Sequence, residues 1–258
     1  MNTTLITGAS SGIGAAFARK LAARGRNVLL VARSEEKLVA LCNELGRLSG
    51  IRAHYFALDL LQPDAAAQLV EETQRRELMI DMLINNAGFG SMKDFARLDL
   101  ARELEMIDLN VKSLVELTHR FLQPMRDRKQ GSIINVASTA GFQPVPYMAT
   151  YAATKAFVLS FSEALWEENR EHGVHVMALC PGVTETNFFA AAKMARPPLR
   201  TIQTAEEVVE VALRALAHRK PSVISGWSNW IQVEAERFVP RSFVIKIAGN
   251  ALRSQLEE

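Results

Sequence analysis

Seven short apolar runs alternate along the chain with longer segments of helical periodicity, and this alternation constrains the fold more than any other feature. The runs cover residues 3–7, 27–32, 52–58, 81–86, 131–137, 174–180 and 221–225. Strands that alternate with helices are typical of β-α-β units and a parallel sheet. Because the runs are almost continuously hydrophobic, we expect helices on both faces of that sheet. The sequence therefore predicts an α/β fold with a doubly wound, seven-stranded parallel sheet.

Six segments of helical periodicity lie between and after these runs. We expect helices over residues 12–24, 34–48, 63–77, 99–128, 149–171 and 204–218. Neither a linker nor an internal repeat divides the chain, and 258 residues suit one large domain. Residues 1–226 are therefore expected to form the α/β domain, and residues 227–258 a helical C-terminal extension of it.

The composition excludes several other classes of protein. Hydrophobic residues make up 48% of the chain and charged residues 22%, which is typical of folded, water-soluble proteins. The 30 basic and 28 acidic residues are scattered over both halves, so we expect no nucleic-acid partner. Cys42 and Cys180 have no metal-site spacing, so we expect no metal and interpret them as reduced thiols of a cytoplasmic protein. No segment has the pattern of a signal peptide or the length of a membrane-spanning helix.

A glycine-rich turn follows the first apolar run and leads directly into the first predicted helix. It reads Thr7-Gly8-Ala9-Ser10-Ser11-Gly12-Ile13-Gly14. Glycines let the backbone turn sharply and approach a pyrophosphate, whose charge is attracted by the free N–H groups at a helix N-terminus. A tight turn without a ligand could use the same glycines. The position at the first strand-to-helix junction favours a Rossmann-like dinucleotide site.

The end of the second apolar run discriminates between the two nicotinamide dinucleotides. An acidic residue there would bond the ribose 2′-hydroxyl and repel a 2′-phosphate, but this chain has Ala32 followed by Arg33. A guanidinium suits a phosphate, so the sequence favours NADP(H) over NAD(H). The alternative interpretation of Arg33 is a solvated charge at the start of a helix.

Tyr151 and Lys155 lie four residues apart on a predicted helix, so both side chains project from one face. This spacing alone is frequent on surface helices. Ser138 ends the fifth apolar run, and a loop containing glycine and proline returns the chain to the same sheet edge before Tyr151. We therefore expect Ser138 and Tyr151 to face one substrate.

In this combination the sequence resembles the short-chain dehydrogenases/reductases over residues 3–225. The shared motifs are Thr-Gly-x-x-x-Gly-x-Gly at 7–14, Asp59-Leu60, Asn85-Asn86-Ala87-Gly88, Asn110, Ser138, Tyr151-x-x-x-Lys155, Pro181-Gly182 and Thr186. The resemblance implies an NADP(H)-dependent oxidoreductase that interconverts a carbonyl and an alcohol by hydride transfer.

The resemblance implies a role for each of four catalytic residues. Tyr151 would be the general acid or base at the substrate oxygen. Lys155 would lower the pKa of that phenol and hold the nicotinamide ribose. Ser138 would bond the substrate oxygen, and Asn110 would hold a water that relays the proton.

The resemblance also implies contacts with the cofactor. Asp59 and Leu60 are expected near the adenine and Asn86 near its ribose, whereas Thr186 would bond the carboxamide and so direct pro-S hydride transfer. The expected cofactor-binding residues are Gly8, Ser10, Ser11, Gly12, Ile13, Gly14, Arg33, Asp59, Leu60, Asn86, Ala87, Gly88, Tyr151, Lys155, Pro181, Gly182, Val183 and Thr186. Ser11 stands where some NADP-preferring members have a basic residue, so Arg33 would determine the cofactor choice largely alone.

Apolar and aromatic residues predominate where we expect the substrate to bind. They lie in the loop after Thr186, with Phe188, Phe189 and Met194, and at Phe89, Met92, Phe95, Gln143, Val145 and Tyr147. Pockets with such linings favour a hydrophobic substrate body, although these side chains could instead pack the loop onto the domain. The expected substrate-binding residues are Ser138, Gln143, Tyr151 and Phe188.

Two competing functions remain open from the sequence. The first is a non-catalytic NADP-binding redox sensor, which would not need the Ser138, Tyr151 and Lys155 set. The second is epimerisation or dehydration of a nucleotide sugar, which the glycine spacing at 7–14 disfavours. The resemblance suggests a homodimer or homotetramer built on the helices at 99–128 and 149–171. The mixed basic and apolar tail could contact a membrane surface, but packing on its own domain is the preferred interpretation.

Overall fold

The computed structural model describes residues 2–47, 50–186 and 202–253, and its centre is the predicted sheet of seven parallel strands. These strands are β1 (Asn2–Thr7), β2 (Asn27–Ala32), β3 (Ala53–Ala57), β4 (Met79–Asn85), β5 (Gly131–Val136), β6 (Val174–Cys180) and β9 (Ser222–Ile224). Their order is β3-β2-β1-β4-β5-β6-β9, so the chain reverses its direction of winding between β1 and β4. In sheets of this kind ligands bind outside the carboxyl ends of the strands at that reversal.

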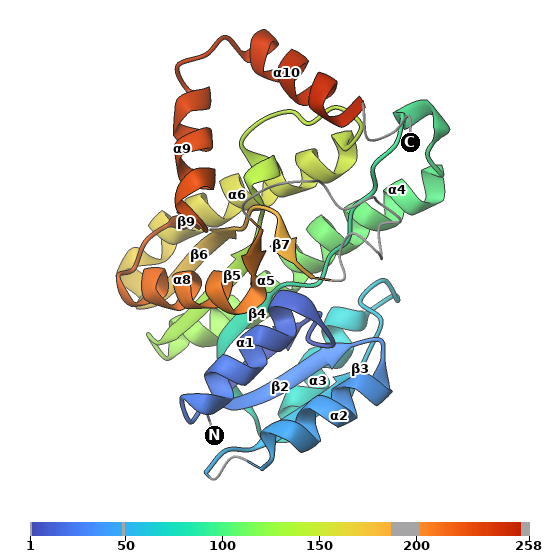
Figure 1. Cartoon of the computed structure of the whole chain (residues 1–258). Helices are drawn as coiled ribbons and strands as arrows, with labels where there is room; N and C mark the ends of the chain where they lie inside the picture. The colour runs from blue at the N-terminus through green and yellow to red at the C-terminus, as the bar shows by residue number, and fades with distance from the viewer. Residues whose placement is uncertain (1, 48–49, 187–201, 254–258) are drawn as a thin grey trace.

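Helices cover both faces of the sheet, as the apolar runs predict (Figure 1). The helices α1 (Gly12–Ala23), α2 (Glu35–Leu45) and α8 (Ala205–Ala217) pack on one face. The other face carries α3 (Ala65–Arg75), α5 (Leu114–Asp127) and α6 (Ala149–Asn169). Short connections complete the domain: β7 (Thr184–Glu185), which pairs with β8 (Gln203–Thr204), and the 3-10 turns η1 (Phe95–Arg97), η3 (Thr139–Gly141) and η4 (Arg170–His172).

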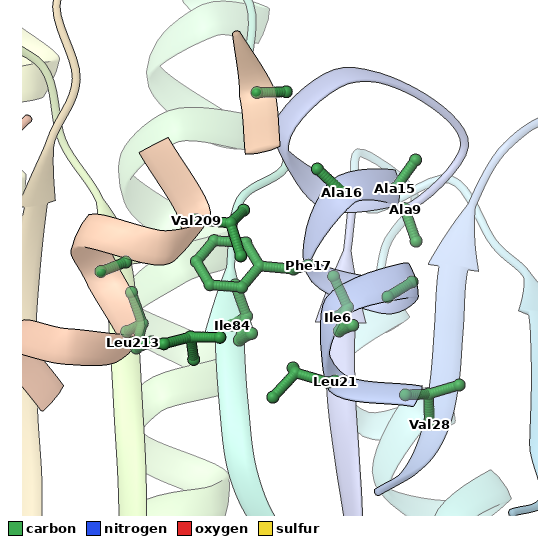
Figure 2. Packing of buried hydrophobic residues seen from close by; sticks show 14 of the residues in the cluster. Ile6, Ala9, Ala15, Ala16, Phe17, Leu21, Val28, Ile84, Val209 and Leu213 are labelled. Carbon is green, nitrogen blue, oxygen red and sulfur yellow. The ribbon is translucent and has the colours of Figure 1, made fainter. Parts of the chain in front are cut away.

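The hydrophobic core is divided by the sheet into two layers. Successive residues of one strand belong to different layers, with Ile6 packed toward α1 and Leu5 toward α3 and α5. This follows from the alternation of side chains along a strand. Figure 2 shows the layer under α1, where the fully buried ring of Phe17 lies beside Val209 of α8 and Ile84 of β4.

The predicted helix at 99–128 is interrupted in the structure. It consists of α4 (Leu100–Ile107), a π-helical segment η2 (Asp108–Ser113) and α5. Such segments insert an extra residue into a turn and are frequent at functional sites. Here the wider turn contains Asn110, one of the predicted catalytic residues. The helical extent is thus predicted correctly, whereas its uniform α geometry is not.

The C-terminal tail is helical, as predicted, and bends at Pro240 between α9 (Trp227–Glu236) and α10 (Arg241–Arg253). Figure 1 shows the two helices as an arch at the end of the molecule that carries α4 and the start of α6. Among the described residues, no helix is long and apolar enough to cross a membrane. Both cysteines, Cys42 and Cys180, are free.

Candidate active site

The glycine turn between β1 and α1 has a backbone that only small residues allow. Gly8 and Gly12 have φ angles of 63° and 54°, in the left-handed region that favours glycine. A Cβ at Gly14 would lie 2.4 Å from the carbonyl oxygen of Gly8, which holds the helix start tightly against the turn. Ser11 is the N-cap residue of α1, but its side chain caps no N–H group, and no acidic residue stands in the first turn. The free N–H groups of α1 are therefore available to an anion.

The ends of β1 and β4 are joined beneath this turn by side chains. The hydroxyl oxygen of Thr7 accepts bonds from the backbone N–H groups of Asn86 and Ala87, at 2.9 and 3.0 Å. The Asn86 side chain donates to the carbonyl oxygens of Thr7 and Gly8, at 3.0 and 3.2 Å. Thr7 thus holds together the strand ends where the strand order reverses, a role that its place in the glycine motif does not predict.

Arg33 and Asp59 lie together at the far end of the crevice. They line an open hollow of about 420 Å³ beyond the ends of β2 and β3. The Asp59 carboxylate accepts a bond from the backbone N–H of Leu61 at 3.1 Å, and the Arg33 side chain is exposed. The two predicted adenosine contacts therefore converge on one cavity.

Ser138, Tyr151 and Lys155 are brought together by β5 and α6. Ser138 caps the turn η3, accepting a bond from the Ala140 N–H at 3.2 Å, and it hydrogen-bonds with Tyr151. Lys155 is 6% exposed and donates from Nζ to the Val136 carbonyl oxygen at 2.7 Å. Its ammonium lies 5.8 Å from the centre of the Tyr151 ring.

The pKa values of this pair are governed by burial. Burial raises the pKa of Tyr151 to about 12, and the hydrogen bond with Ser138 opposes that rise. Burial lowers the pKa of Lys155 to about 8. Burial thus outweighs the effect of the hydrogen bond with Ser138, and Lys155 is not among the causes of the Tyr151 shift.

Asn110 connects the loop after β4 with α6. Its Oδ1 accepts from the Phe89 N–H at 3.1 Å, and its Nδ2 donates to the Phe89 carbonyl at 2.9 Å and to the Thr154 hydroxyl at 3.1 Å. A Cβ at Gly88 would lie 2.7 Å from Asn110 Oδ1 and 3.7 Å from Lys155 Nζ. The loop of Asn86, Ala87 and Gly88 therefore passes directly over the catalytic groups.

The turn after β6 closes the site on its other side. The backbone N–H of Thr139 donates to the Pro181 carbonyl oxygen at 2.9 Å, which places this turn beside Ser138. The side chain of Asn229, on α9, lies against Gly182: a Cβ there would be 2.3 Å from Asn229 Nδ2. That amide also donates to the Ser225 carbonyl at 2.6 Å. Nothing in the sequence predicts this contact of Asn229.

Thr186 lies close to the glycine turn. A Cβ at Gly12 would be 3.0 Å from the Thr186 methyl group, although the two residues lie 174 positions apart in the sequence. The structure thus brings a predicted pyrophosphate contact and the predicted carboxamide contact side by side. Ser10 lies in the glycine turn and Ile13 in the first turn of α1. Val183 follows Gly182, and Leu60 follows Asp59 after β3.

The expected substrate side is only partly described. Phe188, Phe189 and Met194 lie outside the described residues. Gln143 is half-buried, and its side-chain oxygen has no hydrogen-bond partner among the described residues. Tyr147 has a φ of 66°, its backbone oxygen accepts from the Lys93 N–H at 2.9 Å, and its hydroxyl accepts from Arg253 of α10 at 3.0 Å. The tail therefore touches the substrate loop, a contact that the sequence analysis did not predict.

The residues present fit a dinucleotide. The glycine turn offers backbone N–H groups without a capping side chain, Gly88 allows close approach of a ligand to Lys155, and the hollow at Arg33 offers a cation at the far end. No group of three or more His, Cys, Asp or Glu side chains that could hold a metal ion occurs in the described part of the chain.

Comparison with known proteins gives a consistent result. The family model described as short chain dehydrogenase matches residues 2–196. The ketoacyl reductase HetN of Nostoc sp. is 33% identical over 223 residues, which cover 86% of this chain and 77% of the relative. A short-chain dehydrogenase from Sphingobium yanoikuyae in complex with NADPH is 34% identical, with a TM-score of 0.83 over 92% of this chain and 93% of that one. A bulky-bulky ketone specific alcohol dehydrogenase from Comamonas testosteroni is 31% identical, with a TM-score of 0.78 over 92% of each chain.

Proposed function

The chain belongs to the short-chain dehydrogenase family, and on that premise we propose that it is an NADP(H)-dependent oxidoreductase that interconverts a carbonyl and an alcohol on a hydrophobic small molecule. The observation that supports this most directly is the burial of Tyr151 and Lys155 beside Ser138, at the carboxyl ends of the strands. A buried ammonium and a buried phenol reduce stability, so their joint presence argues for a chemical use.

The cofactor would lie across the reversal between β1 and β4. The N–H groups of α1 would hold its pyrophosphate, Arg33 would bond the 2′-phosphate, and Lys155 would hold the nicotinamide ribose. Pro181, Gly182 and Val183 would border the nicotinamide. When bound, the cofactor supplies or accepts the hydride. The NADPH complex of the Sphingobium relative supports the choice of cofactor, as does the exposed guanidinium at the end of β2.

Tyr151 would donate the proton to the carbonyl oxygen during reduction. A phenol whose pKa is raised to about 12 stays protonated near neutral pH, so it is ready to act as an acid. Ser138 would bond the same oxygen and stabilise the charge that develops on it. In the reverse direction Tyr151 would have to lose its proton first, which a positive charge brought near its hydroxyl would favour.

A water held near Lys155 would return the proton to Tyr151 from solvent. The Asn110 carboxamide is engaged with Phe89 and Thr154, so the main chain of the π-helical segment is the part of Asn110 that would hold this water. The wide turn of η2 would leave its carbonyl groups more accessible than those of a regular α-helix.

The substrate would carry a hydrophobic body. Phe89, with the guanidinium of Arg102 stacked 3.7 Å above its ring centre, and the loop of Tyr147 would border it. Gln143 and Phe188, which the sequence predicts as substrate-binding residues, would also contact the substrate. The Comamonas relative, described as specific for bulky-bulky ketones, supports a large apolar substrate over a small charged one.

We propose that the protein forms a homodimer or homotetramer through α4, α5 and α6. Leu100, Leu104 and Ile107 on α4 and Phe157 on α6 are exposed apolar side chains. Light scattering of the eluted protein from a sizing column would measure the assembly directly.

The test of the proposed function is to follow absorbance at 340 nm with NADPH or NADH against a panel of hydrophobic aldehydes, ketones and diketones. Oxidation of NADPH by at least one of them is expected, with a loss on the order of a hundredfold or more in Tyr151→Phe. Full activity in the variant would refute the proposed chemistry. Tight NADPH binding with no turnover of any compound, and no effect of the Tyr151→Phe change on binding, would favour the redox sensor instead.

A further inference from the structure

The two helices of the tail expose an unusual amount of apolar surface. Val233 is the one buried residue of α9, and α10 contributes none. The tail holds six of the eleven large hydrophobic side chains that are exposed in the described residues: Trp227, Trp230, Ile231, Phe238, Phe243 and Ile247. Phe238 is 88% exposed and Trp227 is 73% exposed. More than half of these exposed side chains thus lie within the 27 residues from Trp227 to Arg253. Such a concentration marks a site of interaction.

These side chains share faces of their helices. Trp227, Trp230 and Ile231 follow the three- and four-residue spacing of one helical face, and the two indole rings stack with centres 5.4 Å apart. Phe243 and Ile247 form the same kind of pair on α10. The opposite side of α10 meets the domain, since Gly249 faces Pro146 with 3.4 Å between a Cβ there and the proline ring. The apolar stripe of α10 therefore points away from the body of the protein.

The second helix of the tail is cationic, whereas α9 carries Glu234 and Glu236. From Arg237 to Arg253 the chain has four basic residues and no acidic one. Arg237 pairs with Glu234 at 3.0 Å, but neither Arg241 nor Lys246 forms an ion pair within the described part of the chain. Lys246 lies three residues after Phe243 and one before Ile247, so its charge is on the apolar face itself.

This combination fits a lipid surface better than a second copy of the chain. Lysine is depleted at the centre of protein interfaces, and two copies of α10 packed against each other across a two-fold axis would bring like charges together. At a bilayer, in contrast, lysine and arginine bond anionic headgroups while tryptophan and phenylalanine rings lie at the same depth.

We propose that α9 and α10 dock the protein on an anionic membrane surface. Phe238, Phe243 and Ile247 enter the headgroup boundary, and Arg241 and Lys246 bond the phosphates above it. Because Arg253 at the end of α10 bonds Tyr147 of the substrate loop, docking places the substrate side of the active site next to the bilayer. A hydrophobic substrate dissolved in lipid would then reach the site without crossing water.

The experiment is co-sedimentation of the whole protein with vesicles of phosphatidylcholine alone and of phosphatidylcholine mixed with phosphatidylglycerol. We expect binding to the mixed vesicles, and its loss in high salt. The double change Arg241→Gln/Lys246→Gln should weaken binding by roughly fivefold for each charge removed. Phe243→Ser/Ile247→Ser should weaken it roughly tenfold or more. The matched control is Arg47→Gln/Arg52→Gln, which removes two exposed charges beside α2 and β3 and should bind as the unaltered protein does.

Three results would overturn the proposal. The first is no binding to the mixed vesicles. The second is equal binding to both kinds of vesicle that the Arg241 and Lys246 changes leave unaltered. The third is dissociation of an oligomer by Phe243→Ser/Ile247→Ser without vesicles, which would assign the surface to a second copy. NADPH binding by each variant in solution, which tests the proposed function separately, also shows that the variant is folded.

Discussion

Replacing Lys155 by methionine should stabilise the cofactor-free protein near neutral pH while it abolishes catalysis. Burial lowers the pKa of this ammonium from 10.5 to about 8. Each pKa unit corresponds to about 1.36 kcal/mol, so the charged form reduces the free energy of unfolding by about 3 kcal/mol. Methionine has a similar length and no charge, but it leaves the Val136 carbonyl without its donor, a loss of about 1 kcal/mol. The net gain at pH 7 is therefore about 2 kcal/mol.

The sign of the pH dependence follows from the direction of the Lys155 shift. The folded pKa lies below the unfolded one, so the unfolded chain binds more protons between pH 8 and pH 10.5. The stability of the unaltered protein should therefore rise with pH across this window. Below pH 8 the full cost of burying the charged Lys155 applies. At pH 9.5 about 1.4 kcal/mol of the penalty should remain, so the advantage of Lys155→Met nearly disappears.

The assay is urea unfolding without cofactor at pH 7 and pH 9.5, supported by thermal unfolding at pH 7. For a chain of this size 2 kcal/mol should raise the Tm by about 4 °C. The matched control is Lys37→Met, which removes an exposed ammonium from α2 and should change stability little at either pH. The reasoning is refuted if Lys155→Met destabilises the protein at pH 7, or if its effect is the same at both pH values.

Three further changes test other parts of the site. Arg33→Ala should weaken NADPH binding roughly tenfold to a hundredfold and leave NADH binding unaltered; an unchanged preference in titrations with the two cofactors would contradict the cofactor assignment. Ser138→Ala should lower kcat/KM for reduction roughly a hundredfold or more. Because the bond with Ser138 lowers the Tyr151 pKa, its removal should also shift the rise of alcohol oxidation with pH to higher pH, and a rise that stays in place or moves to lower pH argues against that bond. Gly182→Ala should destabilise the protein by about 1–3 kcal/mol through contact with Asn229, and Asn229→Gly should restore stability in the double variant; no rescue in urea unfolding would show that the strain lies elsewhere.

The parts of the fold that could be predicted from sequence are those with a local signal. The seven apolar runs coincide with the seven strands because buried parallel strands must be hydrophobic on both faces. The glycine turn is predictable for a similar reason, since the left-handed φ angles of Gly8 and Gly12 exclude most other residues. Tyr151 and Lys155 are on one helical face, and the structure places them beside Ser138 as expected.

The parts that could not be predicted depend on contacts between distant segments. Asn229 lies 47 residues beyond Gly182, and Arg253 lies 106 residues beyond Tyr147, so no periodicity within one element could reveal either contact. The rise of the Tyr151 pKa through burial was also not predicted. The Tyr151-x-x-x-Lys155 motif shows that a cation is nearby. Burial, however, dominates the shift of the Tyr151 pKa, and the depth of burial depends on the packing of the whole site.

The interrupted helix fixes the position of the substrate side of the site relative to the residues that transfer the proton. Asn110, in the π-helical segment, bonds both backbone groups of Phe89, whose ring supports the guanidinium of Arg102 from the preceding helix. The same carboxamide donates to Thr154, whose hydroxyl donates in turn to the Tyr151 carbonyl oxygen at 2.7 Å. All these groups are neutral apart from Arg102, and a neutral, fully bonded network can be buried without the desolvation penalty that Lys155 carries. A regular α-helix would turn residue 110 away from this position. The extra residue of the π turn therefore lets one side chain hold the loop after β4 against the helix that carries Tyr151.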